Sequence, residues 1–193
     1  MAVEADVDPA LLTRIRDHLP ARDWRDITTA ELAAASGVSR MTLHRRGITK
    51  EAVLAQLGAR LQAEYREALF DAVTATGSAR ERLRRALGAV CEVDERYLVV
   101  LDALAGGLDA IYHEPGAPGA AVLTRPGFTG ALRRLLEDGA RDGSIAVDDP
   151  AETATLLFNA VGHTYRHMRT GHRWPADVVR ERIVSLVLDG LPS

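Results

Sequence analysis

Residues 27–50 read ITTAELAAASGVSRMTLHRRGITK, and this stretch contains two short helix patterns on either side of a glycine. Thr28 and Glu31 are spaced as a capping box, in which the two side chains satisfy the first free amides of a helix. Ser39 is a suitable cap for the second helix. Gly37 supplies the positive φ that a turn between two such helices requires. The stretch therefore predicts a helix-turn-helix.

The second helix of this pair has a buried side and a free side. Leu32, Val38 and Leu43 are spaced to pack inward and to hold the second helix against the first. In helix-turn-helix proteins the second helix enters the major groove of DNA, where arginine can bond guanine and a methyl group can pack on thymine. Helix N-termini and lysine suit the phosphate backbone. The predicted DNA-binding residues are Thr28, Thr29, Ser39, Arg40, Met41, Thr42, His44, Arg45, Arg46 and Lys50, of which Thr28, Thr29 and Lys50 are assigned to phosphates.

The distribution of charge agrees with this interpretation. Residues 39–50 hold four basic residues and no acidic one, whereas the whole chain has a formal net charge of −3. A basic segment on an acidic protein indicates one local anion-binding surface. The negative net charge excludes a polycation that coats nucleic acid along its whole surface. The alternative interpretation of the segment is a solvated helix face.

The motif from Thr28 to Lys50, followed by Glu51-Ala-Val-Leu54, resembles the DNA-binding domain of TetR-family transcriptional repressors. That family reads as a threonine-capped helix, then Ala-Gly-Val-Ser, Thr-Leu-Tyr, and a Lys-Glu pair that opens the fourth helix. This sequence departs from the pattern at His44 and Gly47, which stand where the family has aromatic residues. We expect Gly47 to remove a packing group between the third and fourth helices, and Trp24 to be the buried aromatic of the head.

Helical spacing recurs along the rest of the chain, and alternating strand patterns are nearly absent. Asp8-Pro9 predicts the start of the first helix. We predict an all-α fold of about nine helices, with separate helices around 83–90 and 97–111. The resemblance implies a three-helix head followed by about six helices. The predicted domains are a helix-turn-helix DNA-binding domain over 1–49 and a helical ligand-binding and dimerisation domain over 50–193.

The helix predicted over 149–168 is apolar on two faces, which indicates burial between layers or against a partner. The resemblance implies a homodimer in which this helix and the last one form a four-helix interface. It also implies that the two recognition helices bind a palindromic operator. Core packing within one chain is the alternative for each residue. The predicted interface residues are Leu157, Val161, Tyr165, Val179, Ile183, Leu186 and Val187.

The resemblance further implies a pocket for a small-molecule effector, so we expect a repressor that a ligand releases from its operator. Such pockets are mostly apolar with a few polar groups. For each candidate residue the alternative is plain core packing. The predicted lining residues are Tyr97, Leu101, Leu104, Tyr112, Phe128, Phe158 and His163.

Other kinds of site are poorly represented. A single cysteine, Cys91, excludes an intrachain disulfide framework and fits a reducing compartment. His163 and His167 share a helix face but lack an evident third ligand, so no metal site and no cofactor are predicted. Neither a catalytic set nor a glycine-rich phosphate loop is present, so we do not expect an enzyme. The alternative function is a helical small-molecule-binding protein, or an enzyme, with a degenerate DNA-binding head.

The sequence also bears on location. Its longest apolar runs are shorter than the roughly 20 residues that span a bilayer. The N-terminal residues MAVEADVDPA are acidic and lack the basic and apolar regions of a signal peptide. We therefore expect a cytoplasmic protein without a membrane partner. The 23 arginines against one lysine are typical of a GC-rich genome, which suggests a bacterial source.

Overall fold

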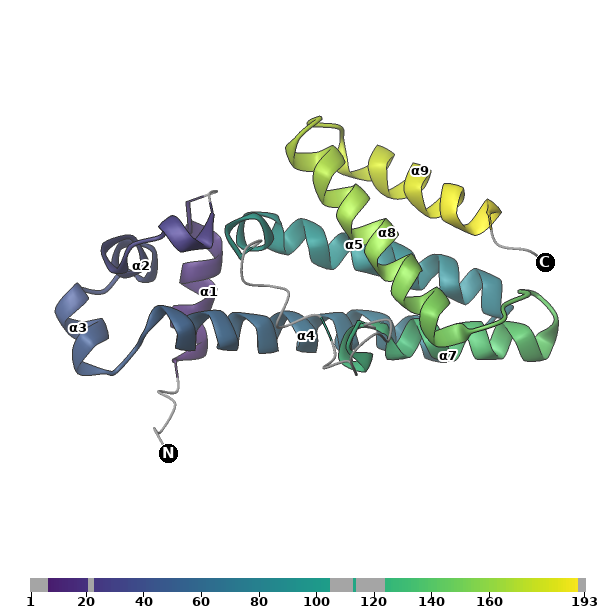
Figure 1. The fold of residues 1–193 in the computed structure, drawn as a ribbon, viewed down its shortest axis with the longest axis horizontal. Helices are drawn as coiled ribbons and strands as arrows, with labels where there is room; N and C mark the ends of the chain where they lie inside the picture. Colours follow the sequence, from purple (N-terminus) through teal and green to yellow (C-terminus); the bar gives the residue numbers. More distant parts are fainter. Residues whose placement is uncertain (1–6, 21–22, 105–112, 114–123, 191–193) are drawn as a thin grey trace, which may run out of the picture. The chain divides into compact units, whose positions relative to one another are not determined.

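The computed structural model describes residues 7–20, 23–104, 113 and 124–190. In these residues the chain forms eight α-helices and one 3-10 turn, and its only β pairing is an isolated bridge between His113 and Thr124. The all-α fold class is thereby confirmed. The elements are α1 (Pro9–His18), η1 (Trp24–Asp26), α2 (Thr29–Ser36), α3 (Arg40–Arg45), α4 (Lys50–Thr74), α5 (Ala79–Leu104), α7 (Pro126–Asp142), α8 (Pro150–Thr170) and α9 (Ala176–Asp189) (Figure 1).

The chain divides into two compact units. The first comprises residues 1–61 and 97–111, and the second comprises residues 62–96 and 112–193. Helices α4 and α5 each contribute one part of their length to each unit. The domain boundary that we predicted after residue 49 coincides with the start of α4, and it stays a prediction.

The first unit is built on α1, which packs against α2, as α2 does against α3. Asp8 caps α1 by accepting a 2.8 Å hydrogen bond from the amide of Ala10, and Pro9 occupies the first helical position. Proline is suited to this position because its missing N–H would have no partner inside the helix. Trp24 is 6% exposed, so the expected buried aromatic of the head is confirmed.

Helix α5 is longer than the sequence indicated. The segments around 83–90 and 97–111 were expected as two helices, but the described residues from Ala79 to Leu104 form one continuous helix. The physical reason is that no glycine or proline interrupts residues 89–104, so nothing in this stretch ends the helix. Its buried side chains recur at helical spacing, at Leu83, Leu87, Val90, Tyr97 and Leu101.

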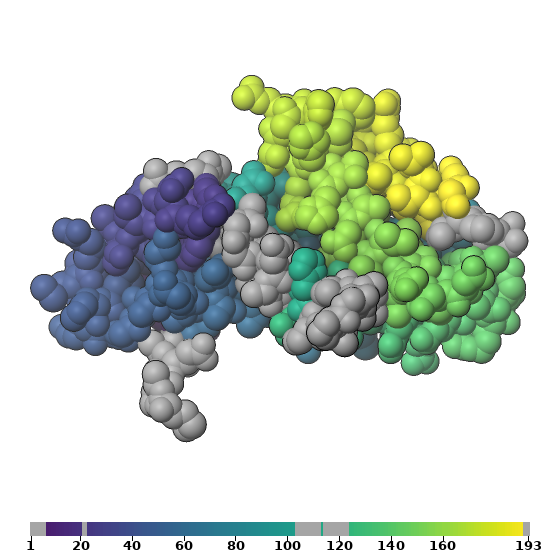
Figure 2. Space-filling model, viewed as in Figure 1, coloured from purple at the N-terminus to yellow at the C-terminus, as the bar shows by residue number. Residues whose placement is uncertain are grey.

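In the second unit, α7 packs against α8 and α8 against α9. In the space-filling view, α8 and α9 lie side by side (Figure 2). Asp149 caps α8 by accepting hydrogen bonds from the amides of Ala151 and Glu152 at 2.8 and 3.0 Å. None of the described helices combines the length and the apolar character needed to cross a membrane.

Candidate functional site

The helix-turn-helix begins with the predicted capping box. The backbone amide of Thr28 donates to Oε2 of Glu31 at 2.9 Å, and the amide of Glu31 donates to Oγ1 of Thr28 at 3.3 Å. Ser39 caps α3 by accepting a 3.1 Å bond from the amide of Thr42. Each short helix thus has its own side-chain cap, and this matters because helices of eight and six residues are marginal without tertiary support.

Gly37 forms the turn between α2 and α3. Its φ is +72°, which is the left-handed region that glycine adopts without a steric penalty. The amide of Gly37 donates to the carbonyl of Ala34 at 3.1 Å, and the amide of Val38 donates to that of Ala33 at 3.2 Å. These two bonds form a Schellman motif, which satisfies the last carbonyls of α2 and directs the chain into α3.

The departure at Gly47 produces a second turn of the same type. Gly47 has a φ of +65°, its amide donates to His44 at 3.0 Å, and the amide of Ile48 donates to Leu43 at 3.0 Å. Ile48 is 8% exposed, so an aliphatic side chain is buried directly after the glycine. The glycine therefore ends α3 cleanly where the sequence led us to expect only a missing packing group.

Helix α3 presents its predicted surface to solvent. Leu43 is 2% exposed and anchors the helix, whereas Met41 is 74% exposed and Arg40, His44, Arg45 and Arg46 are all exposed. Within the described residues, the guanidinium groups of Arg40, Arg45 and Arg46 donate to no other group. The helix therefore carries three unengaged guanidinium groups beside an exposed apolar side chain, a combination suited to guanine edges, phosphates and thymine methyl groups.

Some predicted contact residues have structural tasks in the head. The Ser39 hydroxyl is the cap of α3 and lies 3.0 Å from the hydroxyl of Thr42, which is half-buried. The Thr28 hydroxyl donates to Glu31 at 2.8 Å, so a carboxylate already occupies the N-terminus of α2. Thr29 is exposed.

Lys50 is placed differently from our expectation. Its ammonium donates to the backbone carbonyls of Trp24 at 2.9 Å, Arg25 at 3.3 Å and Ile27 at 2.6 Å. It also lies 5.3 Å from the centre of the Trp24 ring. An ammonium has three N–H donors, and three carbonyls accept here. In this arrangement the half-buried Lys50 links the start of α4 to the segment that precedes α2. Its assignment to a DNA phosphate stays a prediction.

The residues predicted to line a ligand pocket are distributed over both units, and two of them, Phe158 and His163, line one cavity of the second unit. Tyr97 and Leu101 are buried in the first unit, where the guanidinium of Arg16 lies 5.3 Å from the Tyr97 ring centre. Phe128 and Phe158 are buried in the second unit, where both rings meet Tyr65 edge to face at 5.6 and 5.2 Å. Tyr112 and the side chain of Leu104 lie outside the described residues. His163 is exposed, and its Nδ1 is 2.8 Å from Nη2 of Arg166.

A polar cavity in the second unit contains an aspartate that we did not predict. Asp94 on α5 is 1% exposed, and its Oδ1 accepts a hydrogen bond from the Tyr65 hydroxyl of α4. Its Oδ2 is 3.9 Å from Nε of Arg166 on α8, which is too long for a hydrogen bond. Burial raises the pKa of Asp94 to about 6, although the Arg166 charge and the Tyr65 bond both oppose that rise.

A second polar contact, which is partly exposed, links α5 and α8. Glu95 accepts hydrogen bonds from Arg169 at 2.7 and 2.8 Å and from the Tyr165 hydroxyl at 2.8 Å. The Arg169 guanidinium lowers the pKa of Glu95. This arrangement holds α5 against the C-terminal half of α8.

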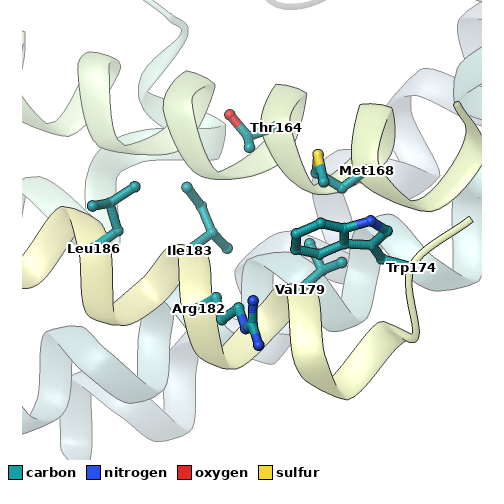
Figure 3. Close-up of a pocket in the computed structure, with 7 residues that line it drawn as sticks. All are labelled: Thr164, Met168, Trp174, Val179, Arg182, Ile183 and Leu186. Carbon is teal, nitrogen blue, oxygen red and sulfur yellow. The ribbon is translucent and has the colours of Figure 1, made fainter. Parts of the chain in front are cut away.

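The predicted interface residues divide into two groups. Leu157, Val161 and Tyr165 are buried within the chain, so their side chains are already covered in the single copy. Val179 and Ile183 are also buried, and they line an apolar groove of about 150 Å³ between α8 and α9 (Figure 3). Its other lining residues are Thr164, Met168, Trp174, Arg182 and Leu186.

Several apolar side chains are exposed on α8, on α9 and in the connection between them. Leu156 is 69% exposed, Leu186 is 70% exposed and Trp174 is 38% exposed, while Val187 is half-buried. Of these, Leu156 and Trp174 were not among the predicted interface residues. The second apolar stripe of the helix over 149–168, on which Leu156 lies, was the sequence signal for this face.

The histidines of the second unit do not form a metal centre in the described residues, where no group of three or more His, Cys, Asp or Glu side chains is arranged around a common point. The ring of His167 packs edge to face against His172, with ring centres 5.0 Å apart.

Comparisons with known proteins cover both units. Residues 76–191 match the protein-family model described as tetracyclin repressor-like, C-terminal domain. No protein of curated function matches the sequence. The fold is similar to that of the transcriptional regulator FadR from Bacillus subtilis in complex with stearoyl-CoA, with 13% identity, a TM-score of 0.72 and coverage of 95% of this chain and 98% of that one.

Two further solved structures have the same fold. PfmR from Thermus thermophilus, a TetR family transcriptional regulator, is 19% identical, with a TM-score of 0.71 and coverage of 96% of this chain and 100% of that one. A transcriptional regulator of the TetR/AcrR family from Thermobifida fusca is 20% identical, with a TM-score of 0.63 and coverage of 95% and 97%. In each case at least 95% of this chain is aligned.

Proposed function

Because the chain belongs to the TetR family of transcriptional regulators, we propose that it is a homodimeric repressor that a small molecule releases from a palindromic DNA operator. The family consists of DNA-binding transcription regulators, so we propose no enzymatic activity, and we place the protein in the cytoplasm. The observation that carries the proposal is the α3 surface, where Arg40, Arg45 and Arg46 are exposed while Leu43 fixes the helix from below.

The proposed mode of binding follows from this surface. The N-terminal end of α3 enters the major groove, where Arg40 bonds the O6 and N7 atoms of a guanine and Met41 packs on a thymine methyl group. Arg45 and Arg46, near the end of the helix, bond phosphates and fix its orientation. His44 is assigned to a phosphate contact in the same way.

Selection of bound duplexes from a random DNA library tests this proposal. We expect the wild type to enrich a palindrome, because two symmetric heads bind two half-sites. Arg40→Ala should lose roughly 1–3 kcal/mol at the selected site and relax the preference at one base pair of each half-site. Arg134→Ala is the matched control, since it removes an arginine that is 66% exposed on α7, far along the chain from the motif. An unchanged base preference in Arg40→Ala would exclude Arg40 from base recognition.

The proposed dimer uses the outer face of α8 and α9. A groove lined by Trp174, Ile183 and Leu186, together with exposed Leu156, supports burial against a second copy, because exposed apolar patches of this kind mark interaction sites. We expect light scattering to give twice the 20.9 kDa of one chain. Leu186→Asp should yield a monomer, whereas Phe70→Asp, which alters a side chain 65% exposed on α4, should leave the dimer intact. A wild-type monomer at micromolar concentration would contradict this part of the proposal.

The proposed effector acts through the second unit, which contains α7, α8 and α9. The complex of FadR with stearoyl-CoA supports a small-molecule site in this fold. A ligand can release DNA only if it binds the released conformation more tightly than the DNA-bound one. Effector binding and operator binding should therefore weaken each other by the same factor.

A further inference from the structure

The cavity around Asp94 contains a buried acceptor without a hydrogen-bond partner. The Tyr65 hydroxyl donates to Oδ1 of Asp94, but in the described part of the chain no group donates to Oδ2. Buried polar atoms in native proteins are nearly always paired, and an unpaired one is costly. Oδ2 is therefore the atom in this unit that most requires a donor from elsewhere.

The cavity gives such a donor access to Oδ2. It has a volume of about 10 Å³ and is lined by Tyr65, Phe158, Gly162, His163 and Arg166 beside Asp94. A volume of this size admits a single group no larger than a water molecule. Gly162 keeps the space open, because a Cβ atom at this position would lie only 3.0 Å from Oδ2 of Asp94.

The charges around the cavity favour a neutral donor. Nε of Arg166 is 3.9 Å from Oδ2, so the carboxylate of Asp94 already faces one positive charge. A ligand ammonium at Oδ2 would meet the Arg166 guanidinium as a like charge, which costs energy in a buried place. A hydroxyl group satisfies the acceptor without this repulsion.

We propose that this cavity binds the hydroxyl group of a small neutral alcohol, with Oδ2 of Asp94 accepting the hydroxyl proton in a hydrogen bond. The rest of the ligand lies at the rim, beside the exposed His163 and the half-buried Asn159. This inference rests on the proposed function in one respect, since it takes the second unit to be the effector-binding unit. It adds the chemical class of the group that is recognised and the atom that recognises it.

Asp94→Asn provides a sharp test because Tyr65 fixes the orientation of the new amide. The Tyr65 hydroxyl donates, so the carbonyl oxygen of the asparagine takes the place of Oδ1 and its NH2 group takes the place of Oδ2. The group at the cavity then changes from an acceptor to a donor. The hydroxyl group of an alcohol can still accept a hydrogen bond from this NH2 group, but it can no longer donate its proton to Oδ2. The variant should therefore lose the preference for an alcohol over an ether.

Gly162→Ala is the second variant, and it leaves Asp94 unchanged. Alanine is more favourable than glycine inside a helix, so α8 should form normally. The added methyl group fills the space in front of Oδ2. This variant should therefore lose the binding of the hydroxyl group without losing the carboxylate.

The experiment compares benzyl alcohol with benzyl methyl ether as probes, at equal millimolar concentrations, by the thermal unfolding of the full chain. The wild type should be stabilised by the alcohol and not by the ether. At ten times the dissociation constant of the alcohol, its apparent unfolding constant should fall about 11-fold. Asp94→Asn should no longer distinguish the alcohol from the ether, and Gly162→Ala should respond to neither probe. Equal responses to both probes in the wild type, no response to the alcohol, or an unchanged preference in Asp94→Asn would each overturn the proposal.

This test is independent of the one for the proposed function. Thermal unfolding needs no DNA, and the duplex selection needs no effector. A selected operator together with a negative probe experiment would overturn the hydroxyl site and leave the regulator in place. A positive probe experiment without any selected DNA would support the hydroxyl site and contradict the proposed DNA-binding function.

Discussion

Asp94 and Glu95 are neighbours in the chain, but their carboxyl groups lie in opposite electrostatic environments. Asp94 is buried with one oxygen bonded to Tyr65 and the other unpaired, whereas both oxygens of Glu95 accept bonds from Arg169. Burial raises the pKa of Asp94 to about 6, and the Arg169 bonds lower the pKa of Glu95. Two adjacent residues of one helix thus affect the pH dependence of stability in opposite directions.

For Asp94 we expect stability to fall as the pH rises. The folded chain holds the proton up to a pKa of about 6, while the ordinary value is 3.8, so between these values the folded state binds more protons than the unfolded state. Ionisation over this range costs roughly 3 kcal/mol of the free energy of unfolding, because each pKa unit is worth about 1.4 kcal/mol. Asp94→Asn should lack this loss. Urea unfolding of both proteins as a function of pH measures the difference.

A direct titration of the Asp94 carboxyl group tests the same pKa. The Cγ carbon of Asp94, followed by NMR, should titrate with a pKa near 6. Tyr65→Phe should raise that pKa further, since the hydroxyl bond favours the ionised carboxylate. A Cγ resonance that titrates near the ordinary aspartate pKa would contradict the buried position assigned to Asp94.

For Glu95 the sign is the opposite. Its lowered pKa means that the bonds from Arg169 and Tyr165 stabilise the fold above the ordinary value of 4.5, and that this contribution is lost as the pH falls through the folded pKa. Glu95→Gln should therefore cost about 1 kcal/mol at neutral pH, a small amount because the pair is partly exposed. The cost should shrink as the medium becomes acidic. A constant cost at every pH would show that the carboxylate charge is not what Arg169 recognises.

Local rules were sufficient to predict the head from the sequence. The capping box of Thr28 and Glu31, the Ser39 cap and the turn at Gly37 depend only on residues within a few positions of one another, and the structure has all of them. The contacts of Lys50 could not be predicted in this way. Its acceptors lie 23 to 26 positions earlier in the chain, at Trp24, Arg25 and Ile27, and no local pattern reveals them.

In the second unit, the helical periodicity of apolar residues predicted which side chains are buried, but it did not show whether the same chain or a partner covers them. Val161 and Tyr165 were predicted for the dimer interface because they lie on an apolar stripe, but the chain itself buries them. Asp94 had a signal that we did not use. It occupies the place between Val90 and Tyr97 on the buried stripe of α5, where the spacing calls for an apolar side chain. A carboxylate in such a position indicates either a buried polar contact or a site.

Gly37 is expected to be required for its backbone conformation alone. A Cβ atom at Gly37 would meet no atom within 4 Å, yet the φ of +72° disfavours any other residue. Gly37→Ala should destabilise the head by about 1–2 kcal/mol. Gly88→Ala is the matched control, because its Cβ atom would also meet nothing within 4 Å, but the residue lies inside α5. The control should gain about 0.5–1 kcal/mol, and equal effects of the two changes on thermal unfolding would contradict the assignment.

Lys50→Met tests whether the lysine serves the fold or the DNA. Methionine keeps the apolar stem but removes three hydrogen bonds to backbone carbonyls, so we expect a loss of roughly 2 kcal/mol in the free energy of unfolding without DNA. Arg46→Met is the control: its side chain is exposed, and its loss should change stability by less than about 0.5 kcal/mol. The control should instead weaken DNA binding and reduce the salt dependence by about one phosphate contact. If Lys50→Met leaves stability unchanged and shows that salt effect itself, Lys50 is a phosphate contact as the sequence led us to predict.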